Sequence, residues 1–269
     1  MKSPLEIRKI KALATRDFYD WSSYKNQVLT TVLAAAVGLA SWGLNASYRD
    51  VPVPEYNTDF VSFIVVGVLI GSIVLSLGAG LDRRIKPWTV ETLLMTGVNT
   101  PTFVLGTVTW TYVLSVILFV PQLVVSIVVF HTQYNVDPVS LLVAIAISSI
   151  IILGLSMIAT GLRLVTKVND PITWGLAVAS QILSGMTFPV SHLDSYISGL
   201  STVSWFLPQT WIYHIIRLAS LTNASLLDPG VALSFLAAGL FALLLLPLGI
   251  YVFRWGLKRA KRDGTLGWY

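Results

Sequence analysis

Long apolar runs separated by short polar segments dominate the hydrophobic pattern of the chain. A helix of about 20 apolar residues is long enough to cross the hydrocarbon layer of a bilayer, which is roughly 30 Å thick. Six runs reach this length, and we therefore predict an all-α integral membrane protein with six transmembrane helices. The runs cover residues 27–46, 60–81, 103–129, 139–162, 171–189 and 231–253.

The segment before the first run has a helical pattern of its own. Ile7, Ile10, Phe18 and Trp21 fall on one side at helical spacing, and basic residues fall on the other side. This pattern predicts an amphipathic helix that lies on the cytoplasmic membrane surface, and a disordered basic tail is the alternative. We therefore divide the chain into an N-terminal interfacial segment, residues 1–25, and a transmembrane domain, residues 26–269. The first run lacks a convincing cleavage site, so we expect it to be retained.

Composition agrees with a membrane protein, and the distribution of charge predicts its orientation. Charged residues make up 12% of the chain, whereas a soluble domain contains about 25%. Of the 18 lysines and arginines, only Arg49 and Arg217 fall on the face opposite to the termini. The positive-inside rule then places both termini in the cytoplasm. We expect a multi-pass protein of the cell membrane, surrounded by lipid and without a nucleic-acid partner.

The pattern contains little that could perform catalysis or ion coupling. All charged residues lie outside the six runs or at their ends, whereas ion-coupled carriers need ionisable groups or broken helices at membrane depth. The chain has no cysteine, and we interpret the widely spaced His131, His192 and His214 as ordinary outer-loop residues and expect no metal site. It also lacks the glycine-rich sequence that cradles ATP phosphates. We therefore expect no enzyme activity and no cofactor on this chain.

Small residues form a stripe along the second run. Gly67 and Gly71 are four residues apart, and so are Ser72, Ser76 and Gly80. Such stripes allow the backbones of two helices to approach closely in a bilayer. The partner helix belongs either to the same chain or to a second copy, and we favour the same chain.

A short helix is predicted in the polar segment between the second and third runs. After the basic pair Arg83 and Arg84, Pro87 precedes a helical pattern over 88–96. Gly97 ends this pattern, as glycine commonly does after the last helical residue. A helix of about two turns is unstable alone in water. Its face therefore needs a partner, for which we favour another protein over the membrane surface.

A second candidate region follows the fifth run, where Ser184-Gly185 and Phe188-Pro189 interrupt an apolar stretch. Backbone groups that are freed at membrane depth must be satisfied by protein or by a water-lined cavity. Residues 184–217 are partly too polar to span, yet they include several aromatic side chains. We predict short re-entrant helices that cover the outer side. An ordinary outer loop with aromatic residues at the lipid headgroups is the alternative.

In order and topology, these two regions resemble the membrane subunits of type-2 ABC exporters, the family of drug, nodulation-factor and surface-glycan permeases. The matches to the family pattern in the first region are Thr89, Glu91, Leu93, Thr96 and Gly106. The matches after the fifth run are Ser184, Gly185, Phe188, Pro189, Leu193, Leu207, Pro208, Thr210 and Arg217. The departures from the pattern are Trp88, Gly97 and Asp194.

The resemblance implies a role for each region. Residues 88–96 would be a coupling helix that inserts into a cytoplasmic ABC ATPase, and residues 184–217 would form an external gate. The residues expected to couple to the ATPase are Arg83, Arg84, Thr89, Glu91, Leu93, Leu94, Met95 and Gly97. Those expected to form the gate are Ser184, Gly185, Phe188, Pro189, Leu207 and Pro208. The complex would contain two ATPase subunits, which bind ATP and Mg, and a second copy of this chain or a homologous permease.

The expected substrate is an amphipathic or lipid-like molecule, such as a drug, a lipid or a lipid-linked glycan. The predicted spans one, four and five offer an uncharged hydroxyl and amide lining, although these groups alternatively serve hydrogen bonds within and between helices. The residues are Thr30, Thr31, Ser41, Ser148, Ser149, Ser156, Thr160, Ser180 and Gln181. A non-transporting scaffold that anchors a cytoplasmic ATPase is the rival function, and an intramembrane transferase is third.

Overall fold

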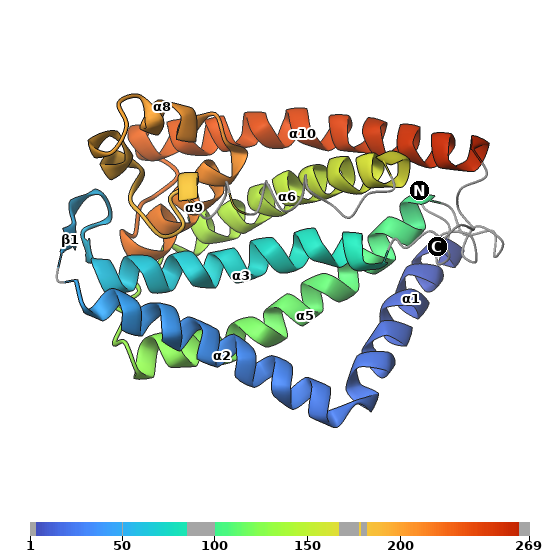
Figure 1. The fold of residues 1–269 in the computed structure, drawn as a ribbon, viewed down its shortest axis with the longest axis horizontal. Coiled ribbons are helices and arrows are strands. Elements are labelled where there is room, and N and C mark those ends of the chain that lie inside the picture. The colour runs from blue at the N-terminus through green and yellow to red at the C-terminus, as the bar shows by residue number, and fades with distance from the viewer. Residues whose placement is uncertain (1–3, 50, 85–99, 167–177, 179–181, 264–269) are drawn as a thin grey trace.

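The computed structural model describes residues 4–49, 51–84, 100–166, 178 and 182–263, and these residues are almost entirely helical (Figure 1). The α-helices are α1 (Pro4–Ser23), α2 (Lys25–Ser47), α3 (Phe60–Arg84), α5 (Thr100–Val128), α6 (Pro138–Thr166), α8 (Leu200–Trp205), α9 (Pro208–Leu221) and α10 (Pro229–Arg262). The shorter elements are β1 (Pro52–Val53), η1 (Pro54–Tyr56), β2 (Thr58–Asp59) and η2 (Val190–Ser195). The two strands pair antiparallel as a hairpin around η1.

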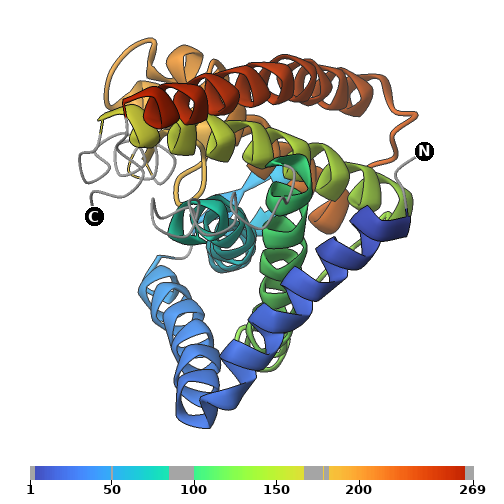
Figure 2. The same ribbon diagram turned by 90° about the vertical axis from the view of Figure 1, so that its right-hand side faces the viewer.

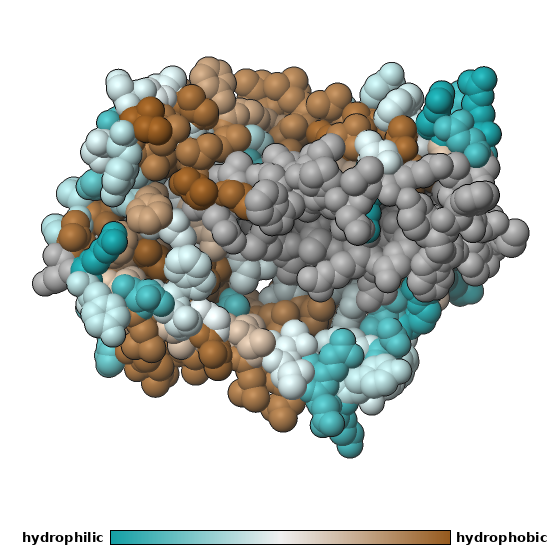
Figure 3. Space-filling model, viewed as in Figure 1, coloured by the Kyte–Doolittle hydropathy of each residue, from teal (hydrophilic) through white to brown (hydrophobic). Residues whose placement is uncertain are grey.

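Long helices determine the shape of the molecule. Helices α6 and α10 lie side by side along one edge, and α3 and α5 lie beneath them (Figure 1). Helices α1 and α2 meet in a V on the other side (Figure 2). The short elements β1, α8 and α9 gather at one end (Figure 1). Hydrophobic residues colour much of the long helices, and hydrophilic ones gather toward the ends of α1 and α10 (Figure 3).

The observed helices confirm the prediction of a helical membrane protein. Four described stretches are long and apolar enough to cross a bilayer, namely Lys25–Ser47, Val108–Val128, Pro138–Thr166 and Pro229–Arg262. Helix α3 coincides with the second predicted run, although its fully described apolar part, Phe60–Ile73, is shorter. Most of the fifth run lies outside the described residues. The number of six transmembrane helices therefore stays a prediction.

Helices α6 and α10 touch along their backbones. Gly154 and Gly161 on α6, like Gly249 and Gly256 on α10, are seven residues apart, so each pair shares one face of its helix. A Cβ atom placed on Gly249 would lie 2.5 Å from the carbonyl oxygen of Gly154, and one on Gly256 would collide with the carbonyl oxygen of Gly161. Glycine is thus required for this approach. The order of the contacts shows that the two helices run parallel.

Helix α1 packs its apolar side against α5. Leu13 covers Gly106, where an added Cβ atom would lie 2.9 Å from the Leu13 Cδ1 atom. The rings of Phe18 and Trp21 lie 5.8 Å and 6.0 Å from the ring of Trp110, measured between centroids. The N-terminal segment is therefore helical and has a protein partner. Its place at a membrane surface stays a prediction.

A buried glutamine joins three helices. Gln122 of α5 accepts a hydrogen bond of 2.7 Å from the hydroxyl of Ser72 on α3. Its amide nitrogen donates to the carbonyl oxygen of Ala35 on α2, at 3.3 Å. Gln122 is only 5% exposed, so water cannot replace these two bonds, and protein groups satisfy both polar ends of the side chain. The side chain therefore ties α2 to the α3–α5 pair.

Replacing Gln122 with leucine should modestly weaken the attachment of α2. Hydrogen bonds between helices in a bilayer contribute about 1 kcal/mol on average, so we expect the thermal unfolding midpoint in detergent to fall by roughly 2–4 °C. The exposed Gln133 offers a matched control, and its replacement by leucine should leave the midpoint unchanged. Equal midpoints for the two variants would show that the Gln122 bonds are dispensable.

Candidate functional site

The residues predicted to contact an ATPase are mostly beyond the described part of the chain. Thr89, Glu91, Leu93, Leu94, Met95 and Gly97 all lie outside the described residues. Arg83 and Arg84 are the last two residues of α3, and their side chains are not described. The coupling helix therefore stays a prediction, and the structure fixes only the two helices, α3 and α5, that it would connect.

The predicted gate residues lie in the group of short elements at the other end of α3. We call this group the cap, defined as residues 51–59 and 182–228. The helix that contains Ile182 and Leu183 ends before Ser184, and the chain then bends through Gly185 to Pro189. It continues as η2, α8 and α9. The region is therefore built of short helices, as predicted, and their entry into the membrane stays a prediction.

Local sequence explains several turns of the cap. Gly185 has a φ angle of +77°, a left-handed conformation that glycine adopts without strain. Pro208 occupies the first turn of α9, where its missing N–H costs nothing, and Leu207 before it is extended. Asp194 accepts hydrogen bonds from the backbone N–H and the hydroxyl of Ser201, and these bonds lower the pKa of the Asp194 carboxyl. The aspartate that departs from the family pattern therefore fastens η2 to α8.

Arg217 of α9 connects the cap to α3. Its side chain is 1% exposed, and Nη1 donates to the carbonyl oxygen of Gly185 at 2.5 Å. Nη2 donates to the carbonyl oxygens of Met186 at 2.8 Å and of Phe63 at 3.1 Å. The guanidinium carbon lies 3.6 Å from the centroid of the Phe63 ring, a cation–π arrangement. One side chain therefore binds the bend after Ser184 and the first turns of α3.

The charge of Arg217 is balanced by carbonyl dipoles and ring faces. Within the described residues, no carboxylate lies at salt-bridge distance from its guanidinium. Burial lowers the pKa of Arg217 to about 10, so the side chain stays charged at neutral pH. A buried charge is costly unless its surroundings compensate it. Loss of the three carbonyl contacts would therefore leave the cation in an unfavourable place.

The stripe of small residues on α3 receives this part of the cap. An added Cβ atom on Gly67 would collide with the carbonyl oxygen of Met186 and with Nη2 of Arg217. One on Gly71 would lie 2.7 Å from Cε of Met186 and 3.1 Å from the hydroxyl of Tyr213. The two glycines therefore pack against the same chain, as predicted. Ser76 and Gly80 lie on the part of α3 whose side chains are not described.

His214 takes part in a buried polar pair. Its Nδ1 atom lies 2.8 Å from the hydroxyl of Tyr56 and 3.8 Å from a carboxylate oxygen of Glu55. Burial, and next the charge of Arg217, lower the pKa of His214 to about 4. Burial also raises the pKa of Tyr56. At neutral pH a neutral phenol and a neutral imidazole therefore share this hydrogen bond, and the Glu55 contact is not an ion pair.

The interpretation of His214 as an ordinary loop residue is wrong. Its place on one face of α9 with Trp211 and Arg217, three residues before and after, is a signal that the sequence contains. The contacts to Tyr56 could not be foreseen, because they depend on how the hairpin folds back onto α9. His192 is exposed in η2, and among the described residues no three histidines or carboxylates gather as metal ligands.

The remaining gate residues differ in exposure. Ser184 is completely buried and Pro189 is buried, whereas Phe188 is 39% exposed. Leu207 and Pro208 lie at the start of α9, where the hydroxyl of Thr210 donates to the carbonyl oxygen of Ser204 at 2.5 Å. The bend at 184–189 therefore meets Arg217, and Leu207 and Pro208 instead set the angle between α8 and α9.

Most described hydroxyls of the predicted substrate path bond to their own helix. Each donates to the carbonyl oxygen four residues earlier, at 2.5–2.8 Å, and these residues are Thr30, Thr31, Ser149, Ser156 and Thr160. Ser148 is buried and its hydroxyl has no partner. Ser180 and Gln181 lie outside the described residues. For the bonded set, the alternative of hydrogen bonds within helices is favoured.

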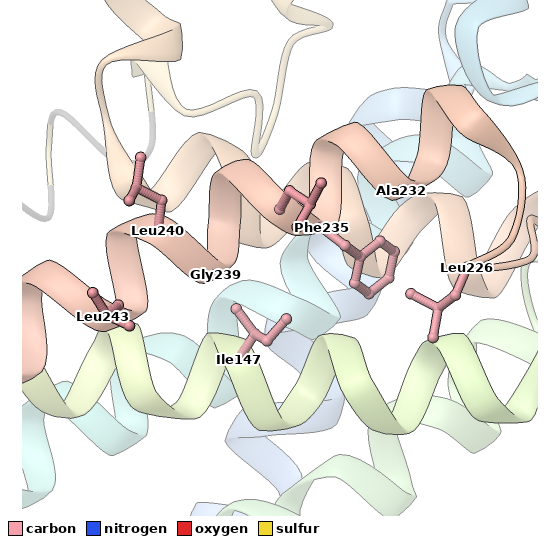
Figure 4. Close-up of a pocket in the computed structure, with 8 residues that line it drawn as sticks. Ile147, Leu226, Ala232, Phe235, Gly239, Leu240 and Leu243 are labelled. Atoms are coloured by element: carbon pink, nitrogen blue, oxygen red, sulfur yellow. The ribbon is translucent and has the colours of Figure 1, made fainter.

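An apolar groove of about 630 Å³ lies between α6 and α10 (Figure 4). Ile147 of α6 and Phe235 of α10 point into the space between the two helices, Leu240 and Leu243 of α10 also line the groove, and Leu226 lies at one end. The groove lies along two helices that are long enough to cross a membrane. Its lining fits an acyl chain or another apolar group, and offers nothing to a charged one.

In comparison with known proteins, no family model and no curated protein matches this sequence.

Proposed function

We propose that the chain is the transmembrane subunit of an ATP-driven ABC exporter. It would have six transmembrane helices and both termini in the cytoplasm, and it would work with a second copy or a homologous permease and with two cytoplasmic ATPase subunits. The proposal rests on the order of the coupling and gate motifs, and one observation supports it above others. The residues of the gate motif contact α3 near its first turns, and the coupling motif follows the last turn of the same helix.

This arrangement provides a mechanical connection between the two motifs. A displacement of residues 88–96 by a closing ATPase would be transmitted along α3, because a helix is stiff over its 25 residues. At the far end, Phe63 and Gly67 support the bend that Arg217 binds. Movement of α3 would therefore change the support beneath the cap without any charged group in the membrane interior.

The groove between α6 and α10 supports a lipid-like substrate. Its described lining is apolar (Figure 4), and in a bilayer the two helices would bring it next to hydrocarbon. An acyl chain could enter there from the side, while a headgroup would travel along a more polar path. A substrate with both parts, such as a lipid or an amphipathic drug, suits these surroundings best.

A charge reversal at Glu91 tests the proposal. We expect Glu91→Lys to insert normally but to reduce ATP-dependent movement of a fluorescent phospholipid at least about tenfold, because a reversed charge at an interface costs several kcal/mol. The measurement uses liposomes that contain the chain and an ABC ATPase that co-purifies with it. Asp20→Lys, at an exposed acidic residue of α1, is the control and should retain transport.

Each possible outcome separates the proposal from its rival. A chain that anchors the ATPase but never moves lipid or drug probes would instead be the non-transporting scaffold. Transport by the purified chain without any ATPase would contradict the proposal, and so would full activity of Glu91→Lys. Chemical labelling that places residues 88–96 outside the cell would contradict the predicted orientation.

A further inference from the structure

Arg217 joins two parts of the chain that are attached to the molecule very differently. Helix α9, which carries it, is fixed by backbone hydrogen bonds to the segment before α6. Asn135 and Asp137 donate to the carbonyl oxygens of Ser220 and Ala219 at 3.1 Å and 3.0 Å, and Asn223 donates back to Asn135 at 2.8 Å. Arg217 thus extends from an anchored helix.

The bend at residues 184–187 is the other part, and it lies at the end of a helix. Carbonyl groups in the last turn of a helix and just after it have no partner within the helix. The carbonyl oxygens of Gly185 and Met186 are such groups, and both receive their hydrogen bonds from Arg217. The planar guanidinium can bind two neighbouring acceptors at once, which a lysine ammonium does less well. Arg217 therefore supplies the side-chain hydrogen bonds to these two carbonyl groups of the bend.

The guanidinium of Arg217 can leave these carbonyl groups more easily than it could leave a carboxylate, because no salt bridge has to be broken. The guanidinium is held by three carbonyls and a ring face, and its Nε atom is buried without a hydrogen-bond partner. The arginine is therefore incompletely satisfied in this arrangement. A buried donor without a partner is unfavourable, which reduces the advantage of this arrangement over one in which the guanidinium is free.

We propose that Arg217 is the positioning residue that holds the bend 184–187 closed against α3, and that opening of the cap requires its guanidinium to leave the carbonyls of Gly185 and Met186. The inference deepens the proposed function by naming the bond that must break for the gate to open. It rests on that function only for the coupling to ATP.

The absence of cysteine from the sequence makes a direct test possible. Ser184 is completely buried, so Ser184→Cys should react slowly with a membrane-impermeant maleimide. In the Arg217→Ala background we expect the labelling rate to rise about tenfold or more, and in Arg217→Lys to rise less. The exposed Ser191→Cys should label at one rate in all three backgrounds. Equal rates for Ser184→Cys in all backgrounds would overturn the proposal.

A second buried cysteine distinguishes local positioning of the bend by Arg217 from general support of the cap. Ser204 is also completely buried in the cap, but it lies in α8 and accepts a hydrogen bond from Thr210 of α9. Ser204→Cys should stay protected when Arg217 is replaced by alanine. If it becomes reactive to the same extent as Ser184→Cys, Arg217 supports the whole cap and the proposal is wrong. Arg259→Ala, which removes an exposed arginine of α10, should change neither rate.

A variant that keeps the arginine covers the case in which Arg217→Ala does not fold. Gly67→Ala places a methyl group against Met186 and Arg217, and it should also increase labelling of Ser184→Cys but not of Ser204→Cys. The labelling experiments need no ATPase. If labelling rises as expected while the ATPase neither binds nor drives transport, the positioning role of Arg217 is supported and the proposed function fails. If the complex transports and Ser184→Cys labels no faster during ATP turnover, the proposed function is supported and the opening of the bend by release of Arg217 is overturned.

Discussion

Replacing Gly256 with valine is expected to lower the thermal unfolding midpoint of the protein in detergent by roughly 5–10 °C. The first added carbon would collide with the carbonyl oxygen of Gly161, which belongs to the backbone of α6 and cannot rotate away. The helices must therefore separate, and Phe253 and Leu257 would lose contacts in the small core beside them. Overpacking of this kind costs about 1–3 kcal/mol, and each kcal/mol shifts the midpoint by roughly 2–4 °C.

Gly239 provides the matched control on the same helix. No heavy atom lies within 4 Å of a Cβ atom built there, so Gly239→Val changes the same residue type without a collision. Its midpoint should equal that of the unmodified protein or rise slightly, since glycine is a poor helix former. A similar loss in both variants would show that intrinsic helix stability, and not contact between α6 and α10, determines the result.

Acidification from pH 7 to pH 4 is expected to cost the cap about 3 kcal/mol through His214. The imidazole has a pKa of about 4 in the folded protein, below the ordinary value of 6.5, so folding favours its neutral form. The stabilisation is present above pH 6.5 and is lost as the pH falls from there toward 4. The size follows from about 1.4 kcal/mol for each pH unit. Protonation would also place a second positive charge beside Arg217, which Glu55 at 3.8 Å only partly offsets.

The pH dependence of the unfolding midpoint should therefore change when His214 becomes glutamine. The glutamine variant should lose less stability between pH 6.5 and pH 4 than the unmodified protein. Asp137 and Asp194 also have a lowered pKa and lose stabilisation in acid, but they do so in both proteins and cancel in the difference. His192→Gln, at an exposed site, should follow the unmodified curve. Parallel curves for all three proteins would contradict the assignment.

The sequence predicts the long helices well because length and hydropathy alone decide them. Helices α2, α3, α5, α6 and α10 lie where apolar runs of spanning length occur. The stripe on α3 was also found, since four-residue spacing of glycine is a recognised packing signal. The seven-residue spacing of Gly154 and Gly161 is a weaker signal in the sequence, although it brings the backbones of α6 and α10 into contact.

The cap could be predicted only in outline. The interruption at Ser184-Gly185 and Phe188-Pro189 indicates a break, but the sequence does not show what satisfies the freed carbonyls. Arg217 does so from more than 30 residues away, and its burial depends on Phe63 and Tyr56 arriving from another part of the chain. Long-range contacts of this kind have no local periodicity, so the sequence predicts the side of the membrane on which Arg217 lies but not its burial.

The paired glycines of α6 and α10 limit how this molecule can deform. Two backbones that interlock at two places, two turns apart, can neither slide nor roll past each other without first separating. Helices α6 and α10 must then move as one rigid unit. Bending or shear occurs instead at the boundary of this unit with α3, where α6 and α9 both meet that helix. Arg217 contacts α3 at this boundary, where the protein can deform most easily.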